Sequence, residues 1–144
     1  MTIVHQSSAH QSRVHQSAVG RGWIAFAALS GAVSVIAGAF AAHGLDPSTK
    51  AAEIGWLHTG SQYEALHAVV MLAVAALAGA RRLSHLATWA QWLFLAGSVL
   101  FPAALYGLAL GGPRWLGAVA PFGGTAFILG WLALAAAALT RKDS

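Results

Sequence analysis

Five side chains of this 144-residue chain are of types that bind protons, cations or hydrogen-bonding ligands, yet they lie in apolar surroundings. They are His43, Tyr63, Glu64, His67 and Tyr106. Imidazole, carboxylate and phenol groups each offer a hydrogen-bond donor, an acceptor or both. An ionisable group inside an apolar segment costs free energy to bury and is therefore a candidate for function. We take these five residues as the candidate ligand-binding set.

No catalytic signature accompanies these residues. The sequence contains no G-x-S-x-G, no H-E-x-x-H and no phosphate-binding glycine loop. It has no cysteine, which excludes disulfides, thiolate metal sites and thiol catalysis. Haem ligation would require His43 and His67 to face each other at one depth. We therefore expect no catalytic residues, no metal site and no cofactor, and we expect that the protein is not an enzyme.

The composition indicates that the solvent of this chain is lipid. Hydrophobic residues make up 58% of the sequence and charged residues only 8%, whereas soluble domains contain about 25% charged residues. The net charge of +4 is therefore better explained by membrane topology than by nucleic-acid binding. The expected partners are the lipid bilayer and either a second copy of the chain or another membrane protein, with no nucleic acid.

The distribution of apolar residues predicts an all-α fold, a four-helix transmembrane bundle. The membrane domain is expected over residues 23–140, with spans at about 23–42, 63–80, 89–110 and 115–139. About twenty apolar residues suffice to cross the hydrocarbon core as a helix. The second span is short, and its helix could begin earlier, because Asp46-Pro47 suits a helix N-terminus. Gly111-Gly112-Pro113 predicts the last turn.

Polar tails flank the four predicted spans. Residues 1–22 contain three HQS triplets and too few apolar residues to fold, so we predict a disordered tail rich in His, Gln and Ser. Metal binding by the triplet histidines is an alternative that rests on composition alone. A signal-peptide cleavage site at 39–41 is a second alternative, disfavoured by the length of the apolar run and the three spans that follow. Residues 141–144 form a basic C-terminal tail.

The positions of the basic residues predict the orientation. Six of the eight Lys and Arg residues lie in the two tails and the second loop, and the other two, Lys50 and Arg114, lie in the first and third loops. Basic residues concentrate on the cytoplasmic side, so both termini are expected in the cytoplasm. His43 then lies at the outer surface, and the other candidate residues lie in the outer parts of their spans.

The position of the candidate residues in the outer parts of the predicted spans supports two interpretations. Pro102 and Pro121 each remove a backbone donor, and freed carbonyls are tolerated at membrane depth only inside protein or beside a wet cavity. An outward-facing polar pocket is one hypothesis. The structural alternative, which we favour, has His43 and an αL Gly44 ending a helix and aromatic residues at the interface. In it Glu64 and His67 either snorkel or hydrogen-bond across helices.

Small residues recur every four positions along the first span. They are Ser30, Ser34, Gly38 and Ala42. Such rows let helix backbones approach closely in lipid, and we predict that these four residues form a helix-packing face.

Four motifs together resemble a known family. GAFAAHGL (38–45), GWLHTGSQYEALH (55–67), LFPAALY (100–106) and APFGGTAFILGW (120–131) are similar, in order and spacing, to the YgdD-like family of small four-span bacterial inner-membrane proteins, a domain of unknown function. Ala41 replaces a glycine of the usual first motif, and Pro102-Ala103-Ala104 replaces a Ser-Gly-Ser of the third. The resemblance implies fold and location but no reaction.

We therefore expect an integral multi-pass protein of the bacterial inner membrane with a structural or interaction role and without catalysis. The alternative function is binding or transport of a small ligand through an outward-facing polar pocket.

The orientation can be tested with single cysteines, because the natural chain has none. Cysteines introduced by Ser8→Cys or Ser144→Cys should stay unlabelled when intact cells meet a membrane-impermeant maleimide, whereas Ser48→Cys should be labelled. Labelling of either terminal cysteine from outside the cell would reverse the orientation.

Overall fold

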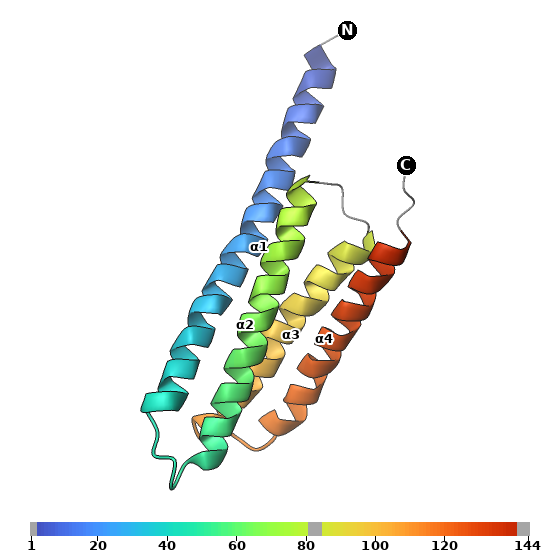
Figure 1. Cartoon of the computed structure of the whole chain (residues 1–144). Coiled ribbons are helices and arrows are strands. Elements are labelled where there is room, and N and C mark those ends of the chain that lie inside the picture. The colour runs from blue at the N-terminus through green and yellow to red at the C-terminus, as the bar shows by residue number, and fades with distance from the viewer. Residues whose placement is uncertain (1–2, 81–84, 141–144) are drawn as a thin grey trace.

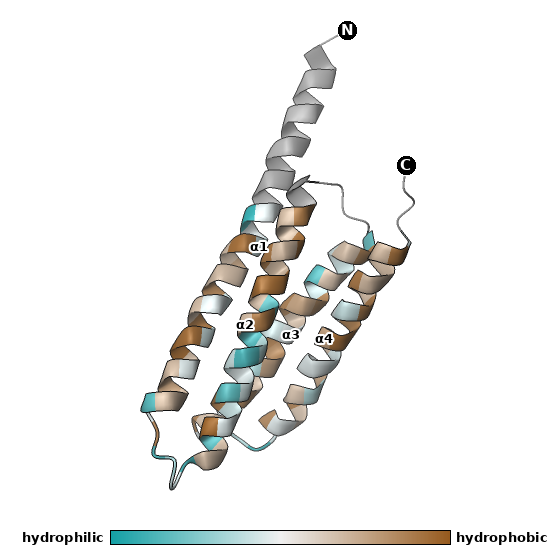
Figure 2. Ribbon diagram, viewed as in Figure 1, coloured by the Kyte–Doolittle hydropathy of each residue, from teal (hydrophilic) through white to brown (hydrophobic). Residues whose placement is uncertain are grey.

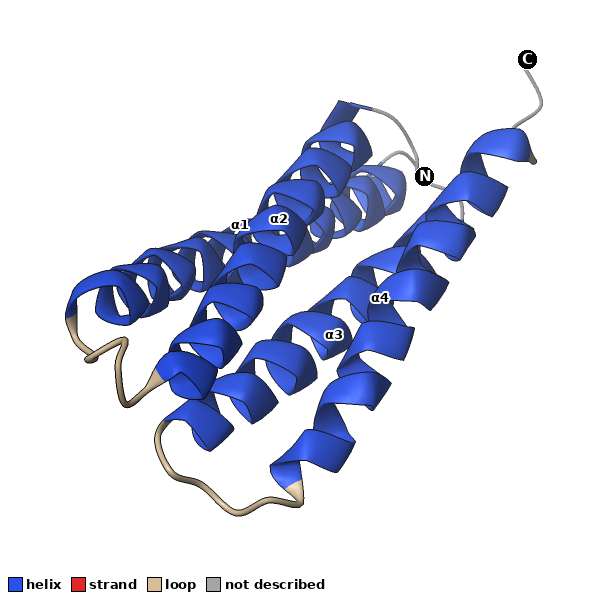
Figure 3. Ribbon diagram, turned by 60° about the horizontal axis from the view of Figure 1, so that its bottom comes forward, coloured by secondary structure: helices blue, strands red, loops and turns tan. Residues whose placement is uncertain are grey.

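The computed structural model describes residues 3–80 and 85–140, and in these ranges the chain forms four helices. The helices are α1 (Ile3–His43), α2 (Ala51–Ala80), α3 (His85–Ala109) and α4 (Leu116–Leu139). They run up and down, so that the loops 44–50 and 110–115 lie at one end and the starts of α1 and α3 at the other (Figure 1). Helices and loops make up all that is described (Figure 3).

The helices pack in chain order, α1 on α2, α2 on α3 and α3 on α4. A larger share of α2 and α3 is buried than of α1 and α4, so the second and third helices form the centre. In the described part of the chain all four helices are long and apolar enough to cross a membrane. Large apolar side chains such as Leu29, Val35 and Phe122 are exposed on the outside of the bundle, which suits a lipid solvent.

The second helix is longer than the predicted span 63–80. It begins at Ala51, where the first helical hydrogen bond runs from the Ile54 N–H to the Lys50 carbonyl (3.0 Å). The sequence allowed for an earlier start, although the predicted apolar span began only at residue 63. Asp46-Pro47 does not begin the helix but forms a separate turn, in which the Ser48 N–H donates to Asp46 Oδ1 (2.9 Å). This bond holds the pKa of the Asp46 carboxyl below its usual value.

The first helix also differs from the prediction, because residues from Ile3 onward continue it where we expected a disordered tail over 1–22. No glycine or proline occurs between residues 3 and 19, so nothing in that stretch interrupts the helix. This part of α1 runs beyond the end of the bundle (Figure 1). The basic tail 141–144 lies outside the described residues.

Glycine ends α3 as predicted but ends α1 in another way. Gly111 has φ +84°, and bonds from the Gly112 N–H to the Gly107 carbonyl (2.7 Å) and from the Gly111 N–H to the Leu108 carbonyl (3.1 Å) make a Schellman cap. In the described residues Gly111 is the only glycine with positive φ. The αL conformation expected at Gly44 is therefore wrong. A Cβ there would lie 2.3 Å from the Phe40 ring, so a larger residue would require that ring to shift.

The α3–α4 contact is an interlock of phenylalanines and glycines. A Cβ added to any of three glycines would come within 2.7 Å of a residue on the other helix, in the pairs Gly130 with Phe94, Gly97 with Phe127, and Gly123 with Phe101. The α3 members of these pairs are spaced by three and then four residues toward the C-terminus. Their α4 partners are spaced by the same three and four residues toward the N-terminus, because the two helices are antiparallel. Pro102 and Pro121 lie inside continuous helices.

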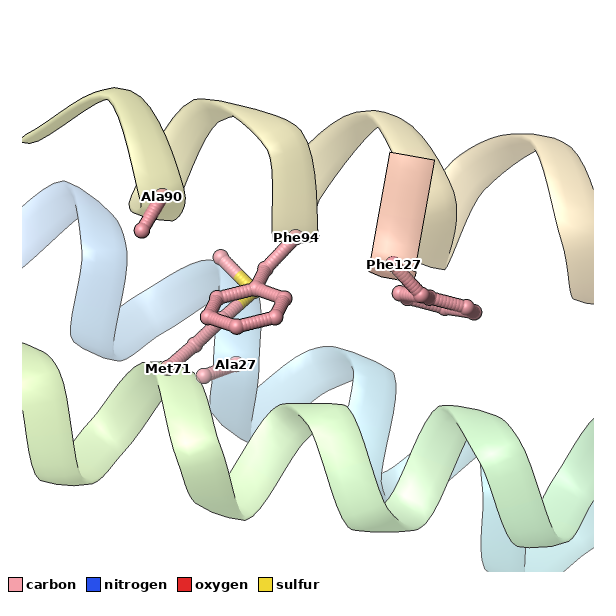
Figure 4. Close-up of a cluster of buried hydrophobic side chains, with 5 residues drawn as sticks. All are labelled: Ala27, Met71, Ala90, Phe94 and Phe127. Carbon is pink, nitrogen blue, oxygen red and sulfur yellow. The ribbon is translucent and has the colours of Figure 1, made fainter. Parts of the chain in front are cut away.

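The apolar core lies where all four helices meet. Its buried residues are Ala27, Met71, Ala90, Phe94 and Phe127. Phe94 and Met71 meet between α3 and α2, with Phe127 alongside (Figure 4). Met71 and Phe94 are fully buried, so this cluster holds the four helices in one arrangement.

Two adjacent glycines on α4 provide a matched test of the interlock. A Cβ at Gly123 would lie 2.5 Å from the Phe101 backbone nitrogen, whereas one at Gly124 would lie 3.9 Å from the Phe101 ring. Gly123→Ala should lower the free energy of unfolding by about 1–3 kcal/mol, because the backbones must separate. Gly124→Ala should be neutral or stabilising, because alanine favours the helix. Equal unfolding midpoints for the two variants would contradict the interlock.

Candidate functional site

Glu64 is the central residue of the span Ala51–Leu77. At 1.5 Å per residue it lies about 20 Å from either end of that span. Its partner on α1, Ser30, is also near the middle of the span Gly20–His43. The sequence placed Glu64 near the end of a span beginning at residue 63; because α2 begins at Ala51, Glu64 lies midway along the helix instead. The carboxyl group therefore lies deep in the bundle.

Glu64 is buried, with 6% of its surface exposed, and each carboxyl oxygen has a hydroxyl partner. The Ser30 hydroxyl donates to Oε1 (2.9 Å) from α1, and the Tyr106 hydroxyl donates to Oε2 (2.7 Å) from α3. The carboxyl group thus joins three helices. Hydrophilic residues are visible along α2 within the bundle (Figure 2).

Glycine at position 60 makes room for the tyrosine. A Cβ on Gly60 would lie 2.6 Å from the Tyr106 ring, so the ring crosses α2 directly over this residue. Glu64 follows one helical turn later on the same face of α2. The absence of a side chain at Gly60 therefore allows the Tyr106 hydroxyl to reach the Glu64 carboxyl group.

No positive charge balances this carboxyl group within the described residues. The ion pair found there joins Lys50 to Glu53 (2.9 Å), near the start of α2. Arg21 is exposed near the start of the span Gly20–His43, and Lys50 and Arg114 are exposed in the loops 44–50 and 110–115. An ionised carboxylate at this depth costs several kcal/mol in lipid, so hydroxyl donors alone must stabilise it or it must take up a proton or a cation.

His67 lies one turn further along α2 in an aromatic cage and is 2% exposed. Its ring stacks on Phe127 with centroids 3.5 Å apart, and its Nε2 accepts a hydrogen bond from Trp131 Nε1 (3.3 Å). Because the indole N–H can only donate, the proton of a neutral His67 is on Nδ1, which lies 2.8 Å from the Tyr63 carbonyl. Both ring nitrogens are thereby occupied, which is the bond pattern of a structural histidine.

The other candidate residues are not part of this centre. His43 is exposed at the end of α1, about 20 Å along that helix from Ser30. The two histidines therefore lie at different depths, which excludes the bis-histidine arrangement. Tyr63 is 45% exposed, and its ring packs against Phe101 at 4.9 Å instead of turning toward Glu64. The structure thus joins Glu64 and Tyr106, places His67 one turn away, and leaves His43 apart.

The predicted packing row on α1 is only partly buried. Ser30 and Ser34 are buried, Gly38 is partly buried with its Cβ position 3.6 Å from Ser61 Oγ, and Ala42 is exposed. Steps of four residues drift by about 40° each around a helix of 3.6 residues per turn. Ala41 therefore takes the buried place expected for Ala42.

Three polar residues of the bundle were missed by the sequence reasoning. Gln91 Nε2 donates to the Met71 carbonyl (3.0 Å), and Trp131 supplies the bond to His67. Ser98 is 4% exposed. Gln91 and Ser98 interrupt an apolar span, and this interruption is the signal that could have identified them. Ser30 was expected to pack, not to hydrogen-bond.

The model of a family described as a protein of unknown function, DUF423, matches residues 37–124. This range covers more than half of the chain and contains both Glu64 and Tyr106. The chain belongs to this family. The resemblance noted in the sequence is thereby confirmed.

Curated relatives share most of their length with this chain. The UPF0382 inner membrane protein YgdD of Escherichia coli K12 is 40% identical over 117 residues, which cover 81% of this chain and 88% of YgdD. A UPF0382 membrane protein of Haemophilus influenzae is 37% identical over 121 residues, covering 84% and 96%. YwdK of Bacillus subtilis is 38% identical over 117 residues, covering 81% and 95%. No solved structure matches the chain.

The relatives and the four apolar helices agree on location. The chain is a multi-pass inner-membrane protein of a family whose function is uncharacterised. The names of these relatives indicate no catalytic role.

The two tyrosines beside Glu64 test the geometry of the site. Tyr106→Phe removes a bond to a buried carboxyl group and should lower the free energy of unfolding by about 1–3 kcal/mol. Tyr63→Phe should change the free energy of unfolding little, because the Tyr63 side chain is exposed. His67 bonds to the backbone carbonyl of Tyr63, which the substitution keeps, and not to its hydroxyl. Chemical or thermal unfolding in detergent measures both. A larger loss for Tyr63→Phe would contradict the hydrogen bond between Tyr106 and Glu64.

Proposed function

We propose that the protein binds a proton or a small cation at Glu64, in the interior of the membrane, and that it is not an enzyme. The observation that carries this proposal is a buried carboxyl group midway along a candidate membrane span, with two hydroxyl partners and no cationic partner among the described residues. Acidic groups in this situation mark proton and ion sites in membrane proteins.

The chemistry of the site supports reversible uptake of a proton or cation by Glu64 instead of a permanently ionised carboxylate. An ionised Glu64 gains two hydroxyl donors, but hydroxyl groups carry no net charge to offset the desolvation of the carboxylate. Uptake of a proton or of one positive ion neutralises it. Ser30 and Tyr106 can rotate their hydroxyl protons, so they can act as donors to the carboxylate or as acceptors from the protonated acid. The same residues therefore accommodate both states.

The orientation is part of the proposal. Both termini lie in the cytoplasm, which is supported by the bias of six basic residues against two. The starts of α1 and α3 lie at one end of the bundle (Figure 1). In this orientation Glu64, Tyr106 and Pro102 lie on the outward side of the core cluster around Met71, so exchange takes place with the outer face.

A structural or interaction role is the second candidate, and one observation favours it. The Ser30, Tyr106 and Trp131 bonds to α2 each tie a different helix to it, so the same groups could serve packing alone. In that case the carboxyl group needs no exchange with its surroundings. Its partner would then be a second copy of the chain or another membrane protein.

The experiment is reaction of membranes containing the full chain with dicyclohexylcarbodiimide, a hydrophobic reagent that modifies protonated carboxyl groups in apolar sites. Mass spectrometry should find the adduct on Glu64, in an amount that falls as the pH rises and the carboxyl group gives up its proton. Glu64→Gln should abolish the adduct.

Glu53 is the matched control, because it is an acidic residue of the same helix but is paired with Lys50 near the helix start. Its modification should be small beside that of Glu64. A Glu64 that stays unmodified at every pH would show that the carboxyl group exchanges nothing, and the structural role would replace this proposal.

A further inference from the structure

Ser98 is a buried polar residue that the network around Glu64 does not use. Its side chain is 4% exposed, and its Oγ has no hydrogen-bond partner among the described residues. A buried hydroxyl without a partner costs about 1–3 kcal/mol. Serines in the membrane interior elsewhere in the bundle are satisfied, since Ser34 Oγ donates to the Gly31 carbonyl (2.7 Å). The oxygen of Ser98 is therefore available to a ligand.

The helical register places Ser98 opposite Glu64. Gln91 on α3 bonds to the carbonyl of Met71 on α2 (3.0 Å). Seven residues further along α3 is Ser98, and seven residues back along the antiparallel α2 is Glu64. Seven residues are close to two full turns, so each returns to the same side of its helix. By this register Ser98 faces α2 at the level of the Glu64 backbone.

A second pair gives the same level. His67 of α2 lies against Phe94 of α3, with ring centroids 5.6 Å apart. Glu64 precedes His67 by about one turn, and Ser98 follows Phe94 by about one turn. Because the two helices are antiparallel, both steps run toward the same end of the bundle. Tyr106, which bonds to Glu64, comes two turns after Ser98 on α3.

Pro102 adds a second oxygen at this position. Proline has no N–H, so the Ser98 carbonyl lacks the donor that residue 102 would give it in a regular helix. Pro102 is itself buried in the continuous helix α3. Ser98 therefore carries an unused hydroxyl oxygen and a carbonyl oxygen without its regular helical partner.

We propose that Glu64 and Ser98 together bind one small monovalent cation of the size of Na⁺, between α2 and α3. This proposal rests on the proposed function of Glu64 and names the ligand. Carboxylate, hydroxyl and carbonyl oxygens are the donors that hard cations prefer. One cation on one carboxylate leaves the site neutral, whereas a divalent ion would leave a positive charge in the apolar interior.

The neighbouring groups support a single positive charge. Asp46 and Glu53, the other acidic residues in the described ranges, are bound to Ser48 and Lys50 near the start of α2. Ser30 and Tyr106 can keep donating to the carboxylate while their remaining lone pairs face the cation. No group of three His, Cys, Asp or Glu residues is present in the described part of the chain, so a transition-metal site is not an alternative there.

The test replaces choline chloride by sodium chloride at constant ionic strength, with the full chain in detergent. Sodium should raise the unfolding midpoint by about 4 °C or more at saturation and should protect Glu64 from the carbodiimide. Ser98→Ala should lose most of both effects, while the carbodiimide still modifies Glu64. This variant should fold, because the deleted hydroxyl has no hydrogen bond to lose.

Two matched controls separate ligand binding from packing. Ser34→Ala removes a buried hydroxyl that is already satisfied, and it should keep the sodium effects. Pro102→Ala restores the N–H that competes for the Ser98 carbonyl, and it should weaken them. Pro121→Ala makes the same backbone change on α4, at an exposed position, and should leave the sodium effects unchanged.

The outcomes distinguish this inference from the proposed function. Modification of Glu64 without any sodium effect in the natural chain would overturn the cation site and leave a proton site. Equal sodium protection in the natural chain and in Ser98→Ala would overturn the role of Ser98. Absence of Glu64 modification under all conditions would remove the proposed function and this inference together.

Discussion

The arrangement of this bundle depends on the polar groups of α2, which must find partners away from water. In lipid, apolar side chains gain little by leaving the solvent for one another, so helices associate through close packing and hydrogen bonds. Four side-chain hydrogen bonds join different helices in the described residues, and each ends on α2, at Glu64, His67 or the Met71 carbonyl. The second helix is thus the polar centre to which the other three are attached.

The α3–α4 contact depends on close packing of the two helices. Glycines on each helix accept phenylalanine rings of the other, and at Gly123 the two backbones come close together. Such contacts depend on shape and on dispersion over many atoms. Both prolines lie inside continuous helices. Pro102 is buried, and a freed carbonyl is tolerated at membrane depth where neighbouring protein surrounds it. The bundle therefore combines a polar side at α2 with a close-packed side at α4.

Glu64 and His67 are neighbours on one helix, but their environments differ in what they can do. His67 has both nitrogens occupied and an aromatic ring on its face, so its bonds are complete as a neutral group. Glu64 has hydroxyl partners that suit two protonation states and no fixed charge to balance it. Because the surroundings of Glu64 fix neither the charged nor the neutral form, Glu64 is the residue that can exchange a proton or an ion.

The sequence by itself determined the membrane location, the helical class, the Gly111 turn and the family, because hydropathy, glycine at a chain reversal and ordered motifs are local properties. It also identified Glu64 and Tyr106 as candidate residues. Only the tertiary structure decided that Glu64 is central, that Ser30 bonds to it, that Ala41 replaces Ala42 in the contact and that His43 stands apart. These facts depend on where α2 begins and on how each helix is rotated against its neighbours. Rotation and register arise from packing between distant segments, which no single stretch of sequence contains.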